Sequence, residues 1–230
     1  MKTVILSEID STNEYAKRNA ENLKNGDAVI AFSQTNGKGT SGRSFVSPFG
    51  GLYVSFVVKN DYPLCRSLVT PAVAVAVQKA VKRVFDVSLG IKWVNDLYKD
   101  GKKVCGILCE NHISCMIIGV GINLSPPKDG FPPDLDVAGV IGDKTVCLSK
   151  KIRLARLIRR YILRFLKTDG KKMLSSYRSA SVVIGKTVQV LSGEEQTKGV
   201  AAYITDKGYL VVNTDDGVKT VFSGTLRILD

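Results

Sequence analysis

The stretch that decides the fold runs from residue 92 to residue 110 and reads KWVNDLYKDGKKVCGILCE. At its centre is Asp100-Gly101, and an Asp-Gly pair between two runs of strand-forming residues predicts a tight β-hairpin. Leu97-Tyr98 belongs to the first arm, and residues 104–109 form the second. The hairpin therefore predicts antiparallel pairing at this point of the chain.

Outward from the hairpin, strand and helix patterns follow one another without the regular βαβ repeat of a doubly wound fold. Ser11-Thr12-Asn13-Glu14 has the form of a capping box, which predicts a helix that begins there. We expect strands at residues 3–9, 27–34, 52–58, 89–93 and 112–122, and further helices at 66–85, 149–167 and 171–178. This order predicts an α+β domain with a mixed or antiparallel sheet and helices on one face.

The character of the chain changes near residue 182. Short apolar runs are separated there by turn sequences at residues 192–193, 206–208 and 215–217. Short strands punctuated by Gly-containing turns are typical of a small β-barrel. We therefore expect two domains, one of residues 1–181 and one of residues 182–230.

The chain is strongly basic. Its 230 residues include 33 Lys or Arg and 21 Asp or Glu, which gives a formal net charge of +12. This balance suits an acidic partner, whether a nucleic acid, an anionic membrane, an acidic protein or a phosphate-bearing substrate. The densest basic run, residues 150–160, has helical periodicity, and we interpret it as the solvated face of an amphipathic helix.

Membrane and export signals are not evident. No run of eighteen apolar residues exists, so the sequence predicts no transmembrane helix and no membrane partner. The N-terminal apolar run ends at Ser7-Glu8, which is too early for a signal peptide. We therefore expect a cytoplasmic protein.

The five cysteines are spaced irregularly and include no Cys-x-x-Cys pair. A zinc site would have to combine Cys105, Cys109 and Cys115 with His112. Their apolar, strand-like surroundings favour reduced, buried thiols, so we expect no metal site here. His112 is the only histidine, which excludes a Ser-His-Asp triad.

Three segments carry residues suited to an anionic substrate. Residues 37–45, GKGTSGRSF, combine glycines, two cations and an aromatic ring, which suits a phosphate beside a flat ring. Lysines between residues 92 and 103 can neutralise a carboxylate and a phosphate brought face to face, although we interpret Lys99 and Lys102 as surface side chains. Residues 119–123, GVGIN, end in an asparagine whose amide can pair with adenine. Taken singly, the first segment is better explained as a turn and the third as a capped strand end.

Taken together and in order, the segments resemble the biotin protein ligase family over nearly the whole chain. The matching residues are Asp10-Ser11-Thr12-Asn13, Gln34-x-x-Gly37-Lys38-Gly39, Lys92-Trp93-x-Asn95-Asp96-Leu97-Tyr98, Lys103-x-x-Gly106-Ile107-Leu108, Gly119-x-Gly121-Ile122-Asn123 and the final Gly224-Thr225-Leu226-Arg227. The resemblance implies a class II aminoacyl-tRNA-synthetase-like biotin/lipoate ligase fold with an SH3-like C-terminal β-barrel. It also implies the form of the family that lacks an N-terminal DNA-binding domain.

The resemblance further implies a reaction and a set of site residues. Members of the family use ATP and Mg²⁺ to make biotinyl-AMP, and then transfer biotin to a lysine of a biotin carboxyl carrier domain. Lys103 and Lys92 match catalytic positions. The implied biotin-binding residues are Ser11, Thr12, Asn13, Gln34, Lys38, Gly39, Thr40, Lys103 and Gly106. The implied ATP-binding residues are Gly37, Lys38, Arg43, Phe45, Asn95, Asp96 and Asn123.

Three positions depart from the family pattern. Thr40 stands where an arginine is usual, Phe45 replaces a tryptophan and Val94 replaces a proline. Phe45 keeps an aromatic face, so that change is mild. Thr40 removes a charge that is expected to help hold the activated intermediate, and we expect it to weaken retention of the adenylate.

Two other functions stay open. A lipoate–protein ligase uses similar chemistry, although the polar set of Ser11, Thr12, Asn13 and Gln34 favours a ureido ring over a dithiolane. A nucleic-acid-binding module would place basic and aromatic residues on the C-terminal strands, where they are few. We therefore expect the basic charge to serve a carrier domain rather than DNA, and the sequence leaves a homodimer open.

Overall fold

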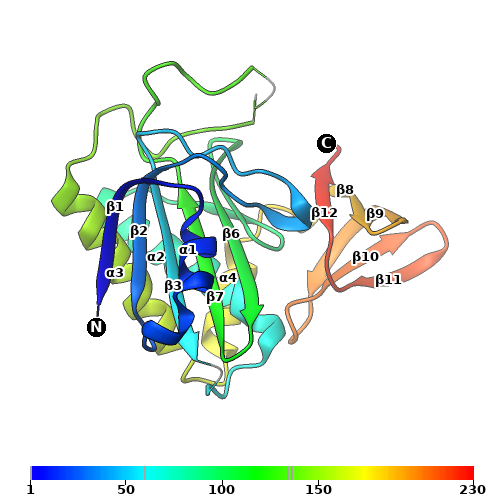
Figure 1. Cartoon of the computed structure of the whole chain (residues 1–230). Coiled ribbons are helices and arrows are strands. Elements are labelled where there is room, and N and C mark those ends of the chain that lie inside the picture. The colour runs from blue at the N-terminus through cyan, green and yellow to red at the C-terminus, as the bar shows by residue number, and fades with distance from the viewer. Residues whose placement is uncertain (1, 60, 134, 136) are drawn as a thin grey trace.

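The computed structural model describes residues 2–59, 61–133, 135 and 137–230. Its larger unit is built on a seven-stranded sheet in the order β1-β2-β3-β7-β6-β5-β4 (Figure 1). The strands are β1 (Thr3–Ile9), β2 (Ala28–Gln34), β3 (Leu52–Lys59), β4 (Gly90–Lys92), β5 (Asp96–Lys99), β6 (Lys102–His112) and β7 (Cys115–Ile122). Because β1 and β2 are parallel and the other neighbours antiparallel, the prediction of a mixed sheet is confirmed.

The Asp100-Gly101 turn joins β5 to β6, as the sequence predicts. Both residues have positive φ angles, 50° and 75°, which this pair of residue types adopts at low cost. β6 continues to His112, and its second half pairs with β7 rather than with β5. The strand expected at residues 112–122 therefore begins at Cys115, because His112 is the last residue of β6.

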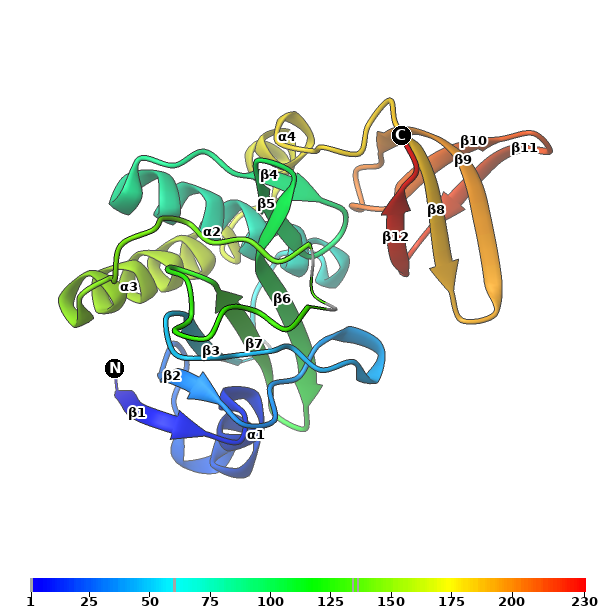
Figure 2. The ribbon, with the colours of Figure 1, turned by 90° about the horizontal axis from the view of Figure 1, so that it is seen from above.

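The sheet carries an apolar core on each face, because side chains alternate along a strand. Four helices accompany it: α1 (Thr12–Arg18), α2 (Val69–Phe85), α3 (Leu148–Phe165) and α4 (Lys171–Ser179). On β7, Ile118 and Val120 belong to the large core that includes α2 and α3, whereas Ile117 faces the other way and packs with Ala16 of α1. Figure 2 shows α1 on one side of the strands and α2 and α3 on the other. The prediction of helices on one face is therefore wrong for α1.

The basic run of residues 150–160 is part of α3, and one of its lysines is not solvated. Lys151 is only 9% exposed; its Nζ donates to Gly51 O at 3.0 Å and lies 5.0 Å from the centroid of the Phe32 ring. Burial lowers the pKa of Lys151. The interpretation of this run as a solvated face therefore needs correction at Lys151, which helps anchor α3 to the sheet.

No helix in the described ranges is both long and apolar enough to cross a membrane. All five cysteines are free, with Cys105 and Cys115 buried and Cys109 half-buried. The burial expected for the three strand cysteines is therefore confirmed for Cys105 and Cys115 and holds in part for Cys109. Cys65 and Cys147, which stand directly before helical segments, are exposed.

The C-terminal unit is a separate antiparallel sheet in the order β11-β10-β9-β8-β12. Its strands are β8 (Thr187–Ser192), β9 (Glu195–Ile204), β10 (Leu210–Thr214), β11 (Gly217–Val221) and β12 (Thr225–Ile228). Within the described part of the chain no ladder joins β11 to β12, so hydrogen bonding does not close a barrel. The SH3-like barrel and the domain boundary at residue 181 stay predictions.

The C-terminal sheet follows α4 along the chain (Figure 2), and hydrogen bonds attach it to the main unit. The buried Trp93 indole Nε1 donates to Gly208 O at 3.0 Å. Arg178 of α4 donates to Ile204 O and to Asp206 Oδ1, both at 2.8 Å. These contacts hold the C-terminal sheet next to β4 and α4.

Candidate active site

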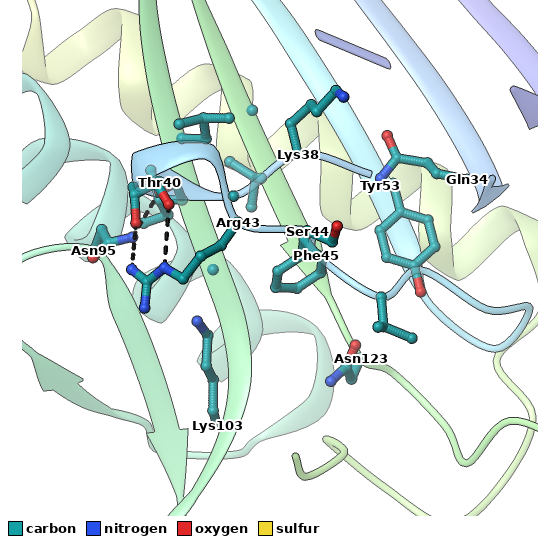
Figure 3. Close-up of a pocket in the computed structure, with 18 of the residues that line it drawn as sticks. Gln34, Lys38, Thr40, Arg43, Ser44, Phe45, Tyr53, Asn95, Lys103 and Asn123 are labelled. Carbon is teal, nitrogen blue, oxygen red and sulfur yellow. Dashed lines mark hydrogen bonds between the residues drawn. The ribbon is translucent and has the colours of Figure 1, made fainter. Parts of the chain in front are cut away.

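A cavity of about 300 Å³ lies on the α1 side of the main sheet, against β6 and β7 (Figure 3). Its wall comes from the start of α1, the loop of residues 35–51, the two strands and the loop of residues 125–145. The sequence-predicted residues that line it are Ser11, Thr12, Asn13, Gln34, Lys38, Gly39, Thr40, Arg43, Phe45, Asn95, Lys103, Gly106 and Asn123. The fold thus gathers segments that are far apart in the sequence.

The glycine-rich loop folds back on itself at the edge of this cavity. Phe45 N donates to Gly37 O at 2.9 Å, and Gly39 N donates to Arg43 O at 2.7 Å, so residues 37–45 form a narrow, irregular hairpin. A side chain at Gly37 would collide with the Phe45 carbonyl oxygen. Glycine is therefore needed where the two arms meet, and the closed loop fixes the position of Phe45.

Phe45 lies against glycines of β6 and β7. A Cβ at Gly106 would be 2.8 Å from the Phe45 ring, and a Cβ at Gly121 would be 2.5 Å from it. Both distances are shorter than van der Waals contact, so the ring reaches the sheet because these positions have no side chain. The Lys103 ammonium lies 5.7 Å from the ring centroid, within the range of a cation–π interaction.

Thr40 holds Arg43 within the loop. The Arg43 guanidinium donates to Thr40 O at 3.2 Å and to Thr40 Oγ1 at 2.8 Å (Figure 3). Both residues line the cavity. Arg43 therefore places a cation beside Thr40, three residues further along the chain. The Thr40 hydroxyl orients this guanidinium.

A chain of hydrogen bonds ties the start of α1 to the glycine-rich loop. Gln34 Oε1 accepts from Thr12 N at 2.8 Å and from Thr12 Oγ1 at 3.1 Å. Gln34 Nε2 donates to Ser47 Oγ at 2.8 Å, and Ser47 Oγ donates to Phe45 O at 2.7 Å. The buried Ser55 Oγ lies 2.8 Å from Thr12 Oγ1. These bonds fix the orientation of the polar groups at this corner before any ligand arrives.

The side-chain amide of Asn13 lies at the same polar corner, and both its oxygen and its nitrogen already have hydrogen-bond partners. Its Oδ1 accepts from Ser55 Oγ, and its Nδ2 donates to Glu110 Oε2 at 2.7 Å. Glu110 is also ion-paired with Lys17 at 2.7 Å. A Cβ at Gly119 would collide with the Asn13 amide. Asn13 therefore packs directly on β7 and braces the cavity wall.

Positively charged side chains lie close together where β4, β5 and β6 meet. Lys103 Nζ lies 2.8 Å from Asp96 Oδ1. Lys92 is half-buried, and its Nζ donates to Tyr98 Oη at 3.3 Å. Burial, with a smaller contribution from the Asp96 charge, raises the pKa of Tyr98 to about 12, so the phenol stays neutral beside the ammonium.

The charge of Arg227, in the C-terminal sheet, acts on the same group of side chains, although the sequence motif that contains Arg227 did not place it at the site. Burial is the main cause that lowers the pKa of Lys92. The charges that act on it are Asp96, which raises the pKa, and the cations Lys103, Arg227 and Arg43, which lower it. Together with Lys92, these are four cations against one carboxylate, an excess of positive charge that suits a polyanionic ligand.

Two asparagines border the cavity. Asn95 Nδ2 donates to Ile107 O at 3.0 Å. Asn123 is 7% exposed, and its Nδ2 donates to Gly139 O at 3.1 Å. The Oδ1 of Asn123 has no hydrogen-bond partner among the described residues. Because an unpaired buried acceptor costs about 1–3 kcal/mol, this oxygen is ready to accept a bond from a ligand.

Three predicted site residues do not line the cavity: Gly37, Lys92 and Asp96. Gly37 is buried at the base of the glycine-rich loop. Asp96 lies behind the cavity wall, where it forms an ion pair with the lining residue Lys103. Lys102 is exposed, as the sequence predicts. Lys99 is half-buried and donates to Ile141 O at 3.1 Å, so interpreting it as a free surface lysine was wrong.

The loop of residues 125–145 contributes part of the wall that sequence reasoning missed. Lys103 N donates to Val137 O at 2.7 Å, Gly139 N donates to Lys103 O at 2.8 Å, and Ile141 N donates to Asn123 O at 2.9 Å. The large side chains that this loop adds to the lining are Phe131, Leu135 and Val137. The available signal was the presence of apolar side chains in an otherwise polar loop.

Comparisons with known proteins agree with this geometry. Residues 6–123 match the model of the "Biotin/lipoate A/B protein ligase family", and residues 183–225 match the "Biotin protein ligase C terminal domain". The Bifunctional ligase/repressor BirA of Bacillus spizizenii is 30% identical over 98% of this chain and 72% of the relative. The Biotin–[acetyl-CoA-carboxylase] ligase of Paracoccus denitrificans is 25% identical over 94% and 96% of the two chains.

A solved structure has the same overall shape. The biotin protein ligase from Aquifex aeolicus, in complex with biotin and ATP, superimposes with a TM-score of 0.86. It is 27% identical, and the match covers 99% of each chain. The chain described here therefore belongs to the biotin/lipoate A/B protein ligase family.

The glycines beneath the cavity should be intolerant of a methyl group. Gly119→Ala places a Cβ against the Asn13 amide, and overpacking of this kind costs about 1–3 kcal/mol in unfolding free energy. Gly142→Ala is the matched control, because a Cβ there meets nothing within 4 Å. Urea unfolding followed by circular dichroism compares the two variants. Equal stability of the two would contradict the close contact between α1 and β7.

Proposed function

We propose that this chain is an ATP-dependent biotin protein ligase that acts on a lysine of a biotin carboxyl carrier domain. First, a biotin carboxylate oxygen attacks the α-phosphorus of ATP, and pyrophosphate leaves. Then the lysine amine attacks the carbonyl carbon of biotinyl-5′-AMP, loses a proton and forms an amide as AMP leaves. One observation carries the proposal: a single cavity joins a polar corner, an apolar wall and the cations Lys38, Arg43 and Lys103.

The polar corner suits the ureido ring of biotin. Hydroxyl and amide groups of Ser11, Thr12 and Gln34 line this end, and the apolar chain of the ligand can lie against Leu108, over the glycine positions of β6 and β7. A dithiolane has no hydrogen-bonding groups and would displace water from this polar corner without replacing the bonds that water makes, which argues against lipoate. We assign biotin binding to Ser11, Thr12, Asn13, Gln34, Lys38, Gly39, Thr40, Lys103 and Gly106.

The first step requires two anions to approach each other. The biotin carboxylate and the α-phosphate repel, and a fixed cation between them offsets that repulsion. We assign this role to Lys103, which lines the cavity beside Phe45, with Lys92 adding positive charge behind it. Lys103 would exchange its bond to Asp96 for bonds to the two substrates.

The nucleotide would occupy the side of the cavity formed by Phe45 and Asn123. The Phe45 ring offers an aromatic face for adenine, and the unpaired Asn123 Oδ1 can accept from the adenine amino group. Arg43 and Arg227 would lie nearer the phosphates. We assign ATP binding to Gly37, Lys38, Arg43, Phe45, Asn95, Asp96 and Asn123.

Mg²⁺ would enter with ATP. Among the described residues no group of three or more His, Cys, Asp or Glu side chains could hold a metal by itself. Asp96 is the carboxylate next to the cationic cluster, and one carboxylate with substrate phosphates and water is a usual Mg²⁺ site. When bound, the ion would neutralise the charge that develops on the leaving pyrophosphate.

The test of the function is transfer of label. The chain is incubated with labelled biotin, ATP, Mg²⁺ and a biotin carrier domain, and we expect label on the carrier lysine. Controls omit ATP or use a carrier in which that lysine is arginine, and labelled lipoate replaces biotin in a third arm. No label from biotin, or preferential use of lipoate, would contradict the proposal.

The role of Lys103 can be tested against its neighbour in the same strand. Lys103→Met should lower the rate of biotin-dependent pyrophosphate release by about 10²–10³-fold, because it removes the cation between the two substrates. Lys102→Met removes an equal charge from an exposed position and should change the rate less than threefold. Similar losses in both variants would mean that general positive charge, not Lys103, is responsible.

Thr40 should make the enzyme release its intermediate readily. A charged hydrogen bond is stronger than a neutral one by roughly 1 kcal/mol, which corresponds to about fivefold in dissociation rate. We expect Thr40→Arg to slow release of biotinyl-AMP by several-fold and to reduce labelling of a bystander protein. Thr40→Ala is the control, because it removes only the bond to Arg43. Equal off-rates in the parent and Thr40→Arg would mean that Arg43 already supplies the missing charge.

A further inference from the structure

A basic groove lies outside the candidate active site, between the second half of α2, the second half of α3 and the start of α4. It encloses about 1110 Å³. Its lining includes the cations Lys79, Lys82, Arg83, Arg164, Lys171 and Lys172 against two carboxylates. Lys82 pairs with Asp86 at 2.8 Å, and Lys171 lies 3.8 Å from Asp169. The other four cations have no ion pair among the described residues.

The outer face of α3 extends this charge along one edge of the groove. Arg153, Arg160, Arg164 and Lys167 are all exposed and recur at helical spacing, so they lie on one side of the helix and its last turn. They span about 21 Å at 1.5 Å per residue. α3 contains no acidic residue, although an ordinary solvated face mixes charges of both signs.

Helix dipoles do not account for this row. A cation in the last turn of a helix is favourable, which explains Lys82 and Arg83 on α2 and Arg164 on α3. Arg153 and Arg160 lie further from the end of α3, where the dipole has little effect. Repulsion between these charges opposes folding, and an anionic partner would relieve it.

The groove wall also carries an aromatic pair. Tyr161 and Phe165 of α3 are stacked, with ring centroids 6.3 Å apart and an interplanar angle of 18°. Both rings line the groove and both are half-buried. Cations along an edge and aromatic rings inside a groove are the combination that binds a single-stranded polynucleotide through its phosphates and bases.

The carrier domain does not fit this position. The candidate active site lies on the α1 face of the sheet, whereas α2 and α3 cover the opposite face (Figure 2). A small carrier domain that presents its lysine to the cavity would therefore lie on the other side of the sheet from the groove. This differs from the expectation that the basic charge serves the carrier.

A protein or lipid partner would need exposed apolar side chains, which this surface largely lacks. Among the described residues of α2, α3 and α4, Leu148 is the one exposed large apolar side chain, and it lies at the far end of α3. Protein interfaces have an apolar or aromatic core, and membrane-binding helices insert apolar residues. The surface is suited to phosphates along its edge.

We propose that the α2–α3–α4 groove and the row of cations on α3 form a binding site for a single-stranded polynucleotide. The phosphates would lie along Arg153, Arg160, Arg164 and Lys167, and a base would contact Tyr161 and Phe165. The site is independent of biotin transfer, since it shares no residue with the cavity on the α1 face.

The first test measures binding of fluorescein-labelled 20-mers, oligo-dT and oligo-U, to the full chain by anisotropy. With about four phosphate contacts, the logarithm of the association constant should fall with the logarithm of salt concentration with a slope of about −3. Comparison of oligo-dT with oligo-U shows whether the ribose 2′-hydroxyl contributes. Inorganic polyphosphate, a DNA duplex and anionic lipid vesicles serve as unlabelled competitors. If any of these competes as well as the oligonucleotide, charge alone or another partner is responsible, and the proposal is overturned.

The second test uses matched charge reversals. Arg160→Glu combined with Arg164→Glu should weaken binding by about tenfold or more and reduce the salt slope to roughly −1. Lys24→Glu combined with Lys198→Glu makes the same change in net charge at exposed positions elsewhere, and should weaken binding less than threefold. Both doubles should keep biotin transfer to the carrier. Equal loss of binding in the two doubles would overturn the assignment to this surface.

Discussion

The structure depends on one steric constraint: three positions on β6 and β7 have no side chain. Gly106, Gly119 and Gly121 lie under the cavity, and each is contacted by a side chain from another segment. Asn13 of α1 packs on Gly119, while Phe45 of the glycine-rich loop packs on Gly106 and Gly121. Because a methyl group would prevent these contacts, the glycines set how closely α1 and the loop approach the sheet.

This close approach has an electrostatic consequence. With Phe45 against the sheet, the Lys103 ammonium lies between an aromatic ring and the Asp96 carboxylate. Lys92 is partly removed from water beside it, and Arg227 brings a further cation from the C-terminal sheet. Cations held in place before the ligand arrives need not reorganise when charge develops during a reaction. The same packing that shapes the cavity therefore concentrates its charge.

The parts of the fold that rest on local chemistry could be predicted from the sequence. The Asp100-Gly101 hairpin forms because these residue types accept positive φ angles, and α1 begins at Thr12 because the Ser11 hydroxyl caps the helix. Strand positions followed from apolar patterns. The ordered set of motifs also identified most of the residues that line the cavity, since each motif keeps its own spacing along the chain.

The tertiary structure decided what depends on contacts between distant segments. The sequence alone determined the elements, their approximate limits and the chemical types of the site residues. Only packing showed that α1 covers the opposite face of the sheet, that Lys151 is buried and that the charge of Arg227 acts on Lys92. The physical reason is that periodicity records which side of an element is apolar, whereas burial and electrostatic potential depend on which other elements arrive there.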